Sequence, residues 1–151
     1  MRFIVAFLFI GFAHVVEAQV SVNNQKSSGI ELILSNIRKS DGLIQIGVFR
    51  SEVGYPDKPS FNFSLAKDTI KNGTMRFFFP VDKTGPVSIC ILDDDNRNEK
   101  MDYVLGILPK EGFGFSNNPK ISLRGAPSFS TTSFSFSGGI KEVSVRMVYM
   151  H

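Results

Sequence analysis

Apolar and polar residues alternate along most of this chain, in short runs that end at glycine, proline, asparagine or aspartate. Alternation with a period of two puts the apolar side chains on one face of a β-strand, whereas a helix needs a period of 3.6 residues. No stretch of the sequence has a convincing helical period. We therefore expect strands in seven or eight segments, which are residues 30–34, 43–50, 61–65, 75–80, 87–92, 103–108, 129–136 and 143–149.

Short strands separated by turns predict an all-β fold, namely an antiparallel β-sandwich. A chain of 151 residues is long enough to bury one core. We assign residues 30–150 to a single domain and residues 19–29 to a flexible leader. An outer-membrane barrel fits less well, because its strands run for about 9 to 11 residues. Turn residues predict one hairpin across residues 39–42 and a second across Asn72-Gly73.

Two long segments between the predicted strands lack a regular pattern. Residues 93–102 form a dense acidic and amide loop, and residues 109–127 are rich in glycine, asparagine and proline. Loops longer than about 12 to 15 residues are uncommon in compact domains and are often functional. Within the second segment, Phe113 and Phe115 either plug an open end of the sandwich or form an exposed aromatic platform for a ligand. A break in the alternation near Thr131-Thr132 suggests a β-bulge.

The first 18 residues have the three parts of a secretory signal peptide. A positive charge at the start is followed by an apolar run at residues 3–13, and Val16 and Ala18 are the small residues before a cleavage point. A transmembrane anchor would need about 20 predominantly apolar residues, and His14 and Glu17 interrupt this run. We therefore expect a secreted or periplasmic protein with no transmembrane segment after cleavage.

Charge and the rarer side chains exclude several classes of function. The chain has 17 basic and 14 acidic residues, and the basic residues are scattered, so we expect no nucleic-acid binding. The one cysteine, Cys90, lies in an apolar run, where a free thiol is expected to be buried and unreactive. After cleavage the remaining histidine is His151, at the chain end, which argues against histidine-based catalysis or zinc binding.

Oxygen-bearing side chains recur in the acidic loop with the spacing of a calcium loop. Asp94, Asn96, Asn98 and Asp102 occupy positions 1, 3, 5 and 9, and the Lys100 carbonyl occupies position 7. The match is partial, because position 6 lacks glycine and position 12 lacks glutamate. The alternative is a solvated turn whose side chains bond to their own backbone. Calcium is the one cofactor that the sequence suggests, with these four side chains as ligands.

Three stretches in order resemble a known family, namely residues 53–59 (VGYPDKP), 94–102 (DDNRNEKMD) and 105–118 (LGILPKEGFGFSNN). Together they resemble the secreted bacterial family called domain of unknown function 2141. The resemblance implies an exported protein with an immunoglobulin-like or transthyretin-like sandwich, and it carries no established activity. The family pattern has two glycines where this chain has Arg97 and Glu99, which weakens any transfer of metal binding. We also expect a backbone that does not need positive φ there.

These observations favour a non-catalytic secreted or envelope module that binds an envelope polysaccharide or a protein partner. The alternative is a carboxylate-dependent hydrolase acting on envelope carbohydrate. It would use two carboxylates from Asp93, Asp94, Asp95, Asp102 and Glu111. Carboxylates clustered on one loop suit metal binding better than they suit attack from two sides of a sugar, so we expect no enzyme activity.

The signal-peptide assignment makes a direct prediction about the exported protein. We expect its first residue to be Gln19, because Val16 and Ala18 satisfy the small-residue rule for cleavage. Intact mass spectrometry of the protein recovered outside the cytoplasm measures this. Retention of residues 1–18 in a membrane fraction would instead support the anchor.

Overall fold

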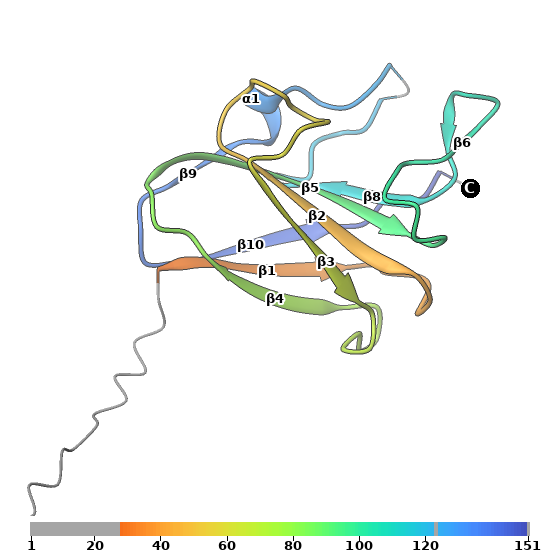
Figure 1. Ribbon diagram of the computed structural model, residues 1–151, viewed down its shortest axis with the longest axis horizontal. Helices are drawn as coiled ribbons and strands as arrows, with labels where there is room; N and C mark the ends of the chain where they lie inside the picture. The colour runs from red at the N-terminus through yellow and green to blue at the C-terminus, as the bar shows by residue number, and fades with distance from the viewer. Residues whose placement is uncertain (1–27, 123, 151) are drawn as a thin grey trace, which may run out of the picture.

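Two β-sheets stack face to face in the computed structural model, which describes residues 28–122 and 124–150 (Figure 1). The predicted signal peptide and nearly all of the predicted leader lie outside the described residues. The first sheet has the order β10 (Ile140–Arg146), β1 (Gly29–Ser35), β4 (Met75–Pro80). The second has the order β3 (Phe61–Ala66), β2 (Leu43–Phe49), β5 (Gly85–Asp94), β8 (Gly112–Phe115), with β9 (Phe134–Phe136) paired to the start of β5. The predicted β-sandwich is confirmed.

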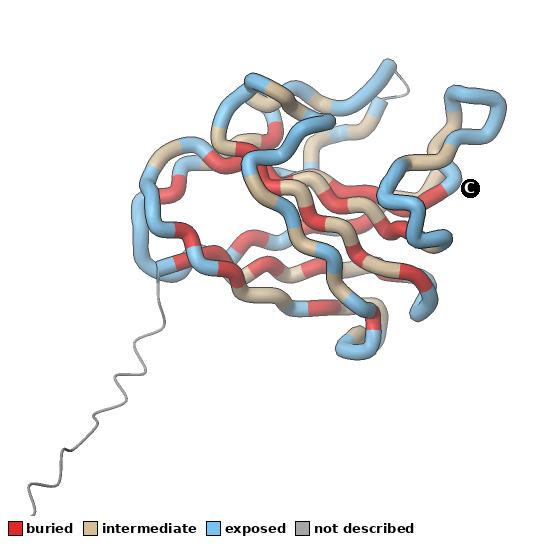
Figure 2. Tube along the Cα trace, viewed as in Figure 1, coloured by how far each residue is buried: buried red, intermediate tan, exposed pale blue. Residues whose placement is uncertain are grey.

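The core lies between the two sheets and consists of the apolar half of each alternating run. In β1 and β2 every second residue is fully buried, as the period of two predicts, and Figure 2 shows red bands that alternate with tan along the strands. Burying one Ile, Leu, Val or Phe side chain stabilises the fold by about 1.5 to 3 kcal/mol. The central members of the core are Ile30, Leu32, Leu34, Ile44, Ile46, Val48, Phe79, Val87, Ile89, Ile91, Val143 and Val145.

The predicted pairing of the strands is wrong in three respects. β1 and β2 do not form a hairpin, because β1 pairs with β4 and β10 whereas β2 pairs with β3 and β5. β3 and β4 likewise lie in different sheets, although Asn72 and Gly73 do make a tight turn with φ angles of 51° and 69°. β1 and β10 run parallel, so the sandwich is not wholly antiparallel. Alternation is the same for every partner and for both directions, so it cannot select among them.

Three local predictions also need correction. Residues 129–136 do not form one bulged strand, because Ser128 caps a short helix, α1 (Phe129–Thr132), by accepting a hydrogen bond from the Thr131 N–H before β9 begins. Residues 103–108 form two strands, β6 (Tyr103–Val104) and β7 (Leu108–Pro109), which pair in a small hairpin. Residues 109–127, predicted to be irregular, contain β8. No helix in the described part of the chain is long and apolar enough to cross a membrane.

Gly42 lies in the turn before β2, where the backbone packs closely against the end of β5. A Cβ at Gly42 would lie 2.2 Å from the Asp94 carbonyl oxygen, and its φ is +83°. A Cβ at Gly138 would meet nothing within 4 Å at a similar φ of +94°. We expect Gly42→Ala to lower the free energy of unfolding by roughly 3 to 5 kcal/mol, against about 1 to 2 kcal/mol for Gly138→Ala, because only the first adds a backbone clash to the strain. Denaturant unfolding measures the loss of stability in both variants, and equal losses would show that the turn at Gly42 can move to accommodate a Cβ.

Candidate functional site

The four predicted metal ligands lie together where the chain leaves β5. Asp94 is the last residue of β5 and is fully buried. Its Oδ1 accepts a hydrogen bond from the Asn98 N–H at 3.1 Å, and its Oδ2 accepts from the Glu99 N–H at 3.0 Å and from the Gln45 side chain at 3.1 Å. A carboxylate that accepts several N–H groups holds a loop closed without an ion.

Asn96, Asn98 and Asp102 complete this loop by bonding to one another and to its backbone. Asn96 Oδ1 accepts from the Asn98 N–H, and Asn98 Oδ1 accepts from the Lys100 N–H. The amide nitrogens of both asparagines donate to Asp102 Oδ2, at 2.6 and 3.1 Å. These contacts match the alternative that the sequence left open, a turn whose side chains bond to their own backbone.

The backbone of the acidic loop corrects one expectation. Arg97 and Glu99, which replace the glycines of the family pattern, still have positive φ angles of 62° and 61°. The two positions therefore keep a left-handed conformation that non-glycine side chains resist. The N–H groups of Asn98 and Glu99 donate hydrogen bonds to Asp94, and these bonds offset the strain at the two positions.

Calcium binding stays a prediction. The described residues contain no group of three or more His, Cys, Asp or Glu side chains placed to hold a metal ion. Calcium takes six to eight oxygen ligands. Asn96 and Asn98 would have to turn their amide oxygens away from the backbone to supply two of them.

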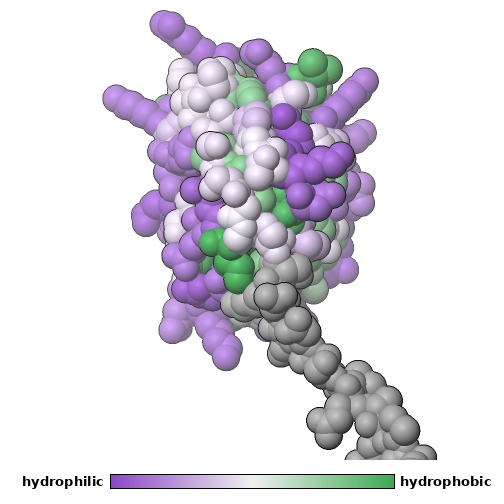
Figure 3. All heavy atoms as spheres, turned by 90° about the vertical axis from the view of Figure 1, so that its left-hand side faces the viewer, coloured by the Kyte–Doolittle hydropathy of each residue, from purple (hydrophilic) through white to green (hydrophobic). Residues whose placement is uncertain are grey.

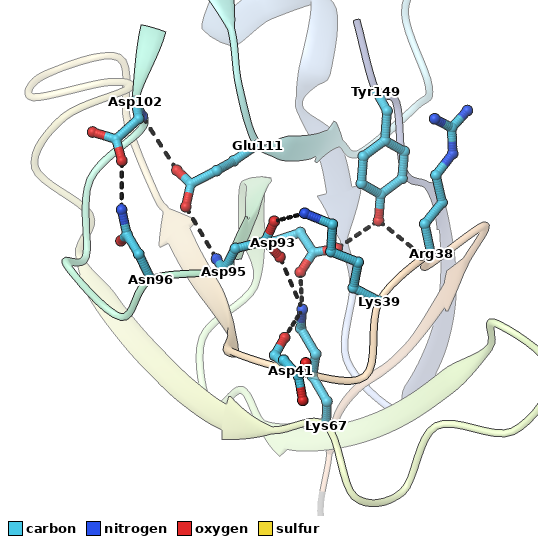
Figure 4. A network of polar contacts seen from close by, with 10 residues as sticks. All are labelled: Arg38, Lys39, Asp41, Lys67, Asp93, Asp95, Asn96, Asp102, Glu111 and Tyr149. Carbon is cyan, nitrogen blue, oxygen red and sulfur yellow. Dashed lines mark hydrogen bonds and ion pairs between the residues drawn. The ribbon is translucent and has the colours of Figure 1, made fainter. Parts of the chain in front are cut away.

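A polar cluster lies behind the acidic loop, at one end of the sandwich core (Figure 4). Asp93 faces into the sandwich and forms an ion pair with Lys67, and both side chains are fully buried. Tyr149 donates a hydrogen bond to Asp93 Oδ2 at 2.5 Å and accepts one from the Arg38 backbone N–H at 3.1 Å. Burial, together with the contact to Asp93, raises the pKa of the Tyr149 hydroxyl well above its usual value, so Tyr149 is a proton donor throughout the physiological range.

Glu111 connects this cluster to the loop. Its two carboxylate oxygens accept the backbone N–H groups of Asp95 and Asp102, at 3.0 and 3.2 Å. Burial raises the pKa of the Glu111 carboxyl, and the two N–H groups partly oppose that rise. Asp95 forms a further ion pair with the exposed side chain of Lys39, and the contact raises the pKa of that amine.

Nothing in the sequence marked Lys67 and Tyr149 as members of this cluster. Lys67 is two residues beyond Leu65 and continues the inward face of β3, and Tyr149 continues the inward face that Val145 and Met147 begin. Alternation could have placed both side chains inward. It could not have shown that they meet Asp93.

A hollow lies on the outer face of the second sheet. A Cβ at Gly114 would lie 2.6 Å from the Val145 side chain in the first sheet, so Gly114 faces inward and its neighbours Phe113 and Phe115 face outward. Cross-strand partners share this face, since Leu92 pairs with Phe113 and Cys90 with Phe115. These four side chains line a cavity of about 650 Å³.

This position corrects two expectations. Phe113 and Phe115 do not plug an end of the sandwich, because they cover the outer face of β8, where their rings meet edge to face at 6.0 Å. Cys90 is only half-buried and lines the cavity, so it is not part of the core. Burial nevertheless raises the pKa of its thiol to about 12, which leaves almost no reactive thiolate near neutral pH.

Three segments form the walls of the cavity. They are the loop at residues 56–59, the stretch at residues 99–109 that contains the β6–β7 hairpin, and residues 121–122 with 125–127, from which Ile121 and Pro127 reach the cavity. The hairpin projects from the body of the domain in Figure 1. It exposes apolar side chains, with Leu105 at 92% and Ile107 at 66%.

Comparison with known proteins gives a family and no function. A family model described as an uncharacterised protein conserved in bacteria matches residues 33–144, more than half of the chain. Neither a curated protein nor a solved structure matches the sequence or the fold.

Asp94 is the residue whose replacement should open the acidic loop. We expect Asp94→Ala to lower the free energy of unfolding by roughly 2 to 4 kcal/mol even in chelator, because it removes three hydrogen bonds that a buried carboxylate accepts from Asn98, Glu99 and Gln45. Asp68→Ala, at an exposed position on the turn after β3, should change it by less than about 0.5 kcal/mol. Equal and small losses for both variants would mean that the loop does not depend on this carboxylate.

The same proteins test for calcium. An extracellular-type site has a dissociation constant of about 10⁻⁴ to 10⁻³ M, so a tenfold excess of calcium stabilises the fold by about 1.4 kcal/mol. We expect millimolar calcium to raise the wild-type melting midpoint by roughly 3 to 6 °C over chelator and to leave Asp94→Ala unmoved. A wild-type midpoint that calcium does not change would leave the four residues as parts of a self-bonded turn.

Proposed function

We propose that this chain, which belongs to the bacterial family of uncharacterised proteins called domain of unknown function 2141, is an exported, non-catalytic binding module. Its ligand is an apolar segment of a protein partner, held in the cavity on the outer face of the second sheet. The single observation that carries the proposal is this cavity of about 650 Å³, which lies within the size range of specific ligand sites.

The chemistry of the lining favours an apolar ligand. The floor is formed by Cys90, Leu92, Phe113 and Phe115, which offer no strong hydrogen-bonding group. Sugar hydroxyls buried against such a floor would lose their bonds to water without replacement, at about 1 to 3 kcal/mol each. Among the polar residues that line the cavity, Asp57, Asn62 and Lys100 are exposed, so they can bond to a peptide backbone. A protein segment therefore fits better than an envelope polysaccharide.

The hairpin beside the cavity extends the apolar surface. Tyr103 and Ile107 line the cavity and are more than half exposed, and Val104 and Leu105 are exposed beside them. Clustered exposed apolar side chains next to a hollow are a feature of interaction sites. By contrast, the side of the domain seen in Figure 3 shows mainly purple and white residues where the grey atoms leave it visible, and its green, hydrophobic areas are small and separate.

A hydrolase is less well supported. Asp95, Asp102 and Glu111 do line one shallow depression on the surface, together with Lys39 and Lys110. Each carboxylate there is held by neighbouring groups, since one oxygen of Asp95 pairs with Lys39, Asp102 accepts two amides and Glu111 accepts two backbone N–H groups. Groups bound in this way hold a loop in place and are poorly placed to attack a sugar.

Export is the remaining part of the proposal. The signal-peptide pattern of residues 1–18 supports secretion or a periplasmic location. A module that displays an apolar hairpin beside a cavity suits a compartment where it meets other envelope proteins.

The cavity can be tested with anilinonaphthalene sulfonate, a dye that fluoresces in apolar sites. We expect one dye per chain, and at least a tenfold loss of affinity in Cys90→Trp, because the indole fills the cavity floor. Ser144→Trp, at an exposed position on the first sheet, should bind the dye as the wild type does. Undiminished dye binding in Cys90→Trp would place the apolar site elsewhere.

The class of partner needs a second arm of the experiment. Peptides selected from a random library on the wild-type domain should be rich in apolar residues, displace the dye, and fail to bind Cys90→Trp. Displacement by envelope oligosaccharides, with no competing peptide selected, would overturn the protein-partner proposal.

A further inference from the structure

The buried side chains of Lys67 and Asp93 form an ion pair, and an amine in contact with a carboxyl group can also react with it to form an amide. The Lys67 amine touches Asp93 Oδ1, and neither side chain is exposed to solvent. The amine also donates a hydrogen bond to the backbone carbonyl of Asp41, in the turn between β1 and β2, and this bond holds the amine in place. Burying two charges costs desolvation free energy, and their attraction offsets that cost only with good geometry and further hydrogen bonds.

We propose that Lys67 and Asp93 condense to form an intramolecular amide bond that links the end of β3 to β5. The inference rests on the polar cluster inside the sandwich and is independent of the ligand cavity on its outer face. Three features of the cluster carry it: contact between the reacting groups, a donor on the carboxyl oxygen that stays, and a carboxylate oxygen beside the amine that accepts no hydrogen bond.

The donor is Tyr149, whose hydroxyl bonds to Asp93 Oδ2 at 2.5 Å. Attack of the amine on the Asp93 carboxyl carbon moves negative charge onto this oxygen, which becomes the carbonyl oxygen of the amide. A fixed hydroxyl donor stabilises such charge most strongly where water is excluded.

The proton acceptor is Asp95. Its Oδ1 lies 3.6 Å from the Lys67 amine, is itself buried, and has no hydrogen-bond partner in the described chain. Its other oxygen is held by Lys39, so the carboxylate is oriented toward the reacting pair, as Figure 4 shows. A carboxylate in this position can take a proton from the nitrogen and return it to the departing oxygen.

The reaction balances without an oxidant, a reductant or another reactant. The Lys67 ammonium passes one proton to the Asp93 carboxyl, and the free amine attacks its carbon. The new bond joins Lys67 Nζ to Asp93 Cγ, and the bond from Cγ to Oδ1 breaks. Oδ1 leaves as water with two protons from the nitrogen, and one proton remains on the amide. Fixing the two groups in contact supplies the large rate advantage of an intramolecular reaction.

Mass spectrometry of the purified wild-type protein tests the bond. We expect an intact mass lower than that of the processed sequence by one water molecule. We also expect a branched tryptic peptide that joins residues 51–71 to residues 84–97, since an acylated Lys67 is not cleaved by trypsin. A wild-type chain at its full sequence mass, with separate peptides ending at Lys67, would overturn the proposal.

Matched variants separate this bond from other losses of water, such as a cyclic imide at Asp41-Gly42. Lys67→Arg should recover the full mass, whereas Lys71→Arg, at an exposed lysine between β3 and β4, should keep the deficit. A deficit that persists in Lys67→Arg would also overturn the bond. Asp95→Asn should leave most of the chains unlinked, and complete linkage in that variant would show that Asp95 is not the proton acceptor.

Discussion

Backbone pairing along β5 is the interaction on which the rest of this structure depends. β5 pairs with β2 along one edge and with β8 and β9 along the other, so it occupies the middle of the larger sheet. Its inward side chains, Val87, Ile89 and Ile91, form part of the core, and Asp93 ends that row. Its outward side chains, Cys90 and Leu92, form part of the floor of the cavity, and Asp94 is the last residue of this outward row. One strand therefore positions the cavity, the acidic loop and the buried ion pair.

The alternation of glycine and phenylalanine in β8 decides which face of the larger sheet is open to a ligand. Gly112 and Gly114 let β8 approach β10 and the residues that follow it, because a Cβ at Gly112 would lie 2.3 Å from the Tyr149 ring and one at Gly114 would lie 2.6 Å from the Val145 side chain. The phenylalanines between and after them must then face outward. Close packing on the inner face and an aromatic surface on the outer face are thus two results of the same short sequence.

The acidic loop and the cavity are mechanically connected. Hydrogen bonds to Asp94 and Glu111 hold residues 95–102 in one conformation, and the chain continues from there into the β6–β7 hairpin, which forms a wall of the cavity. The loop that a calcium pattern marks in the sequence therefore supports the proposed binding surface whether or not it holds an ion. Its anchors, Asp94 and Glu111, are buried, so they position the wall without touching a ligand there.

Much of the local structure followed from the sequence by itself. Alternation placed β1 to β5 and the inward faces of the core, since a period of two has one physical solution when one face is buried. The spacing of Asp94, Asn96, Asn98 and Asp102 located the acidic loop, and the scarcity of histidine argued against most catalytic mechanisms. The tertiary structure alone decided which strands pair, that β1 and β10 run parallel, and that Lys67 and Tyr149 meet Asp93. The tertiary structure also placed Phe113 and Phe115 on the floor of a cavity. Strand partners and contacts between distant residues depend on how the two sheets pack against each other, and no local sequence pattern encodes that packing.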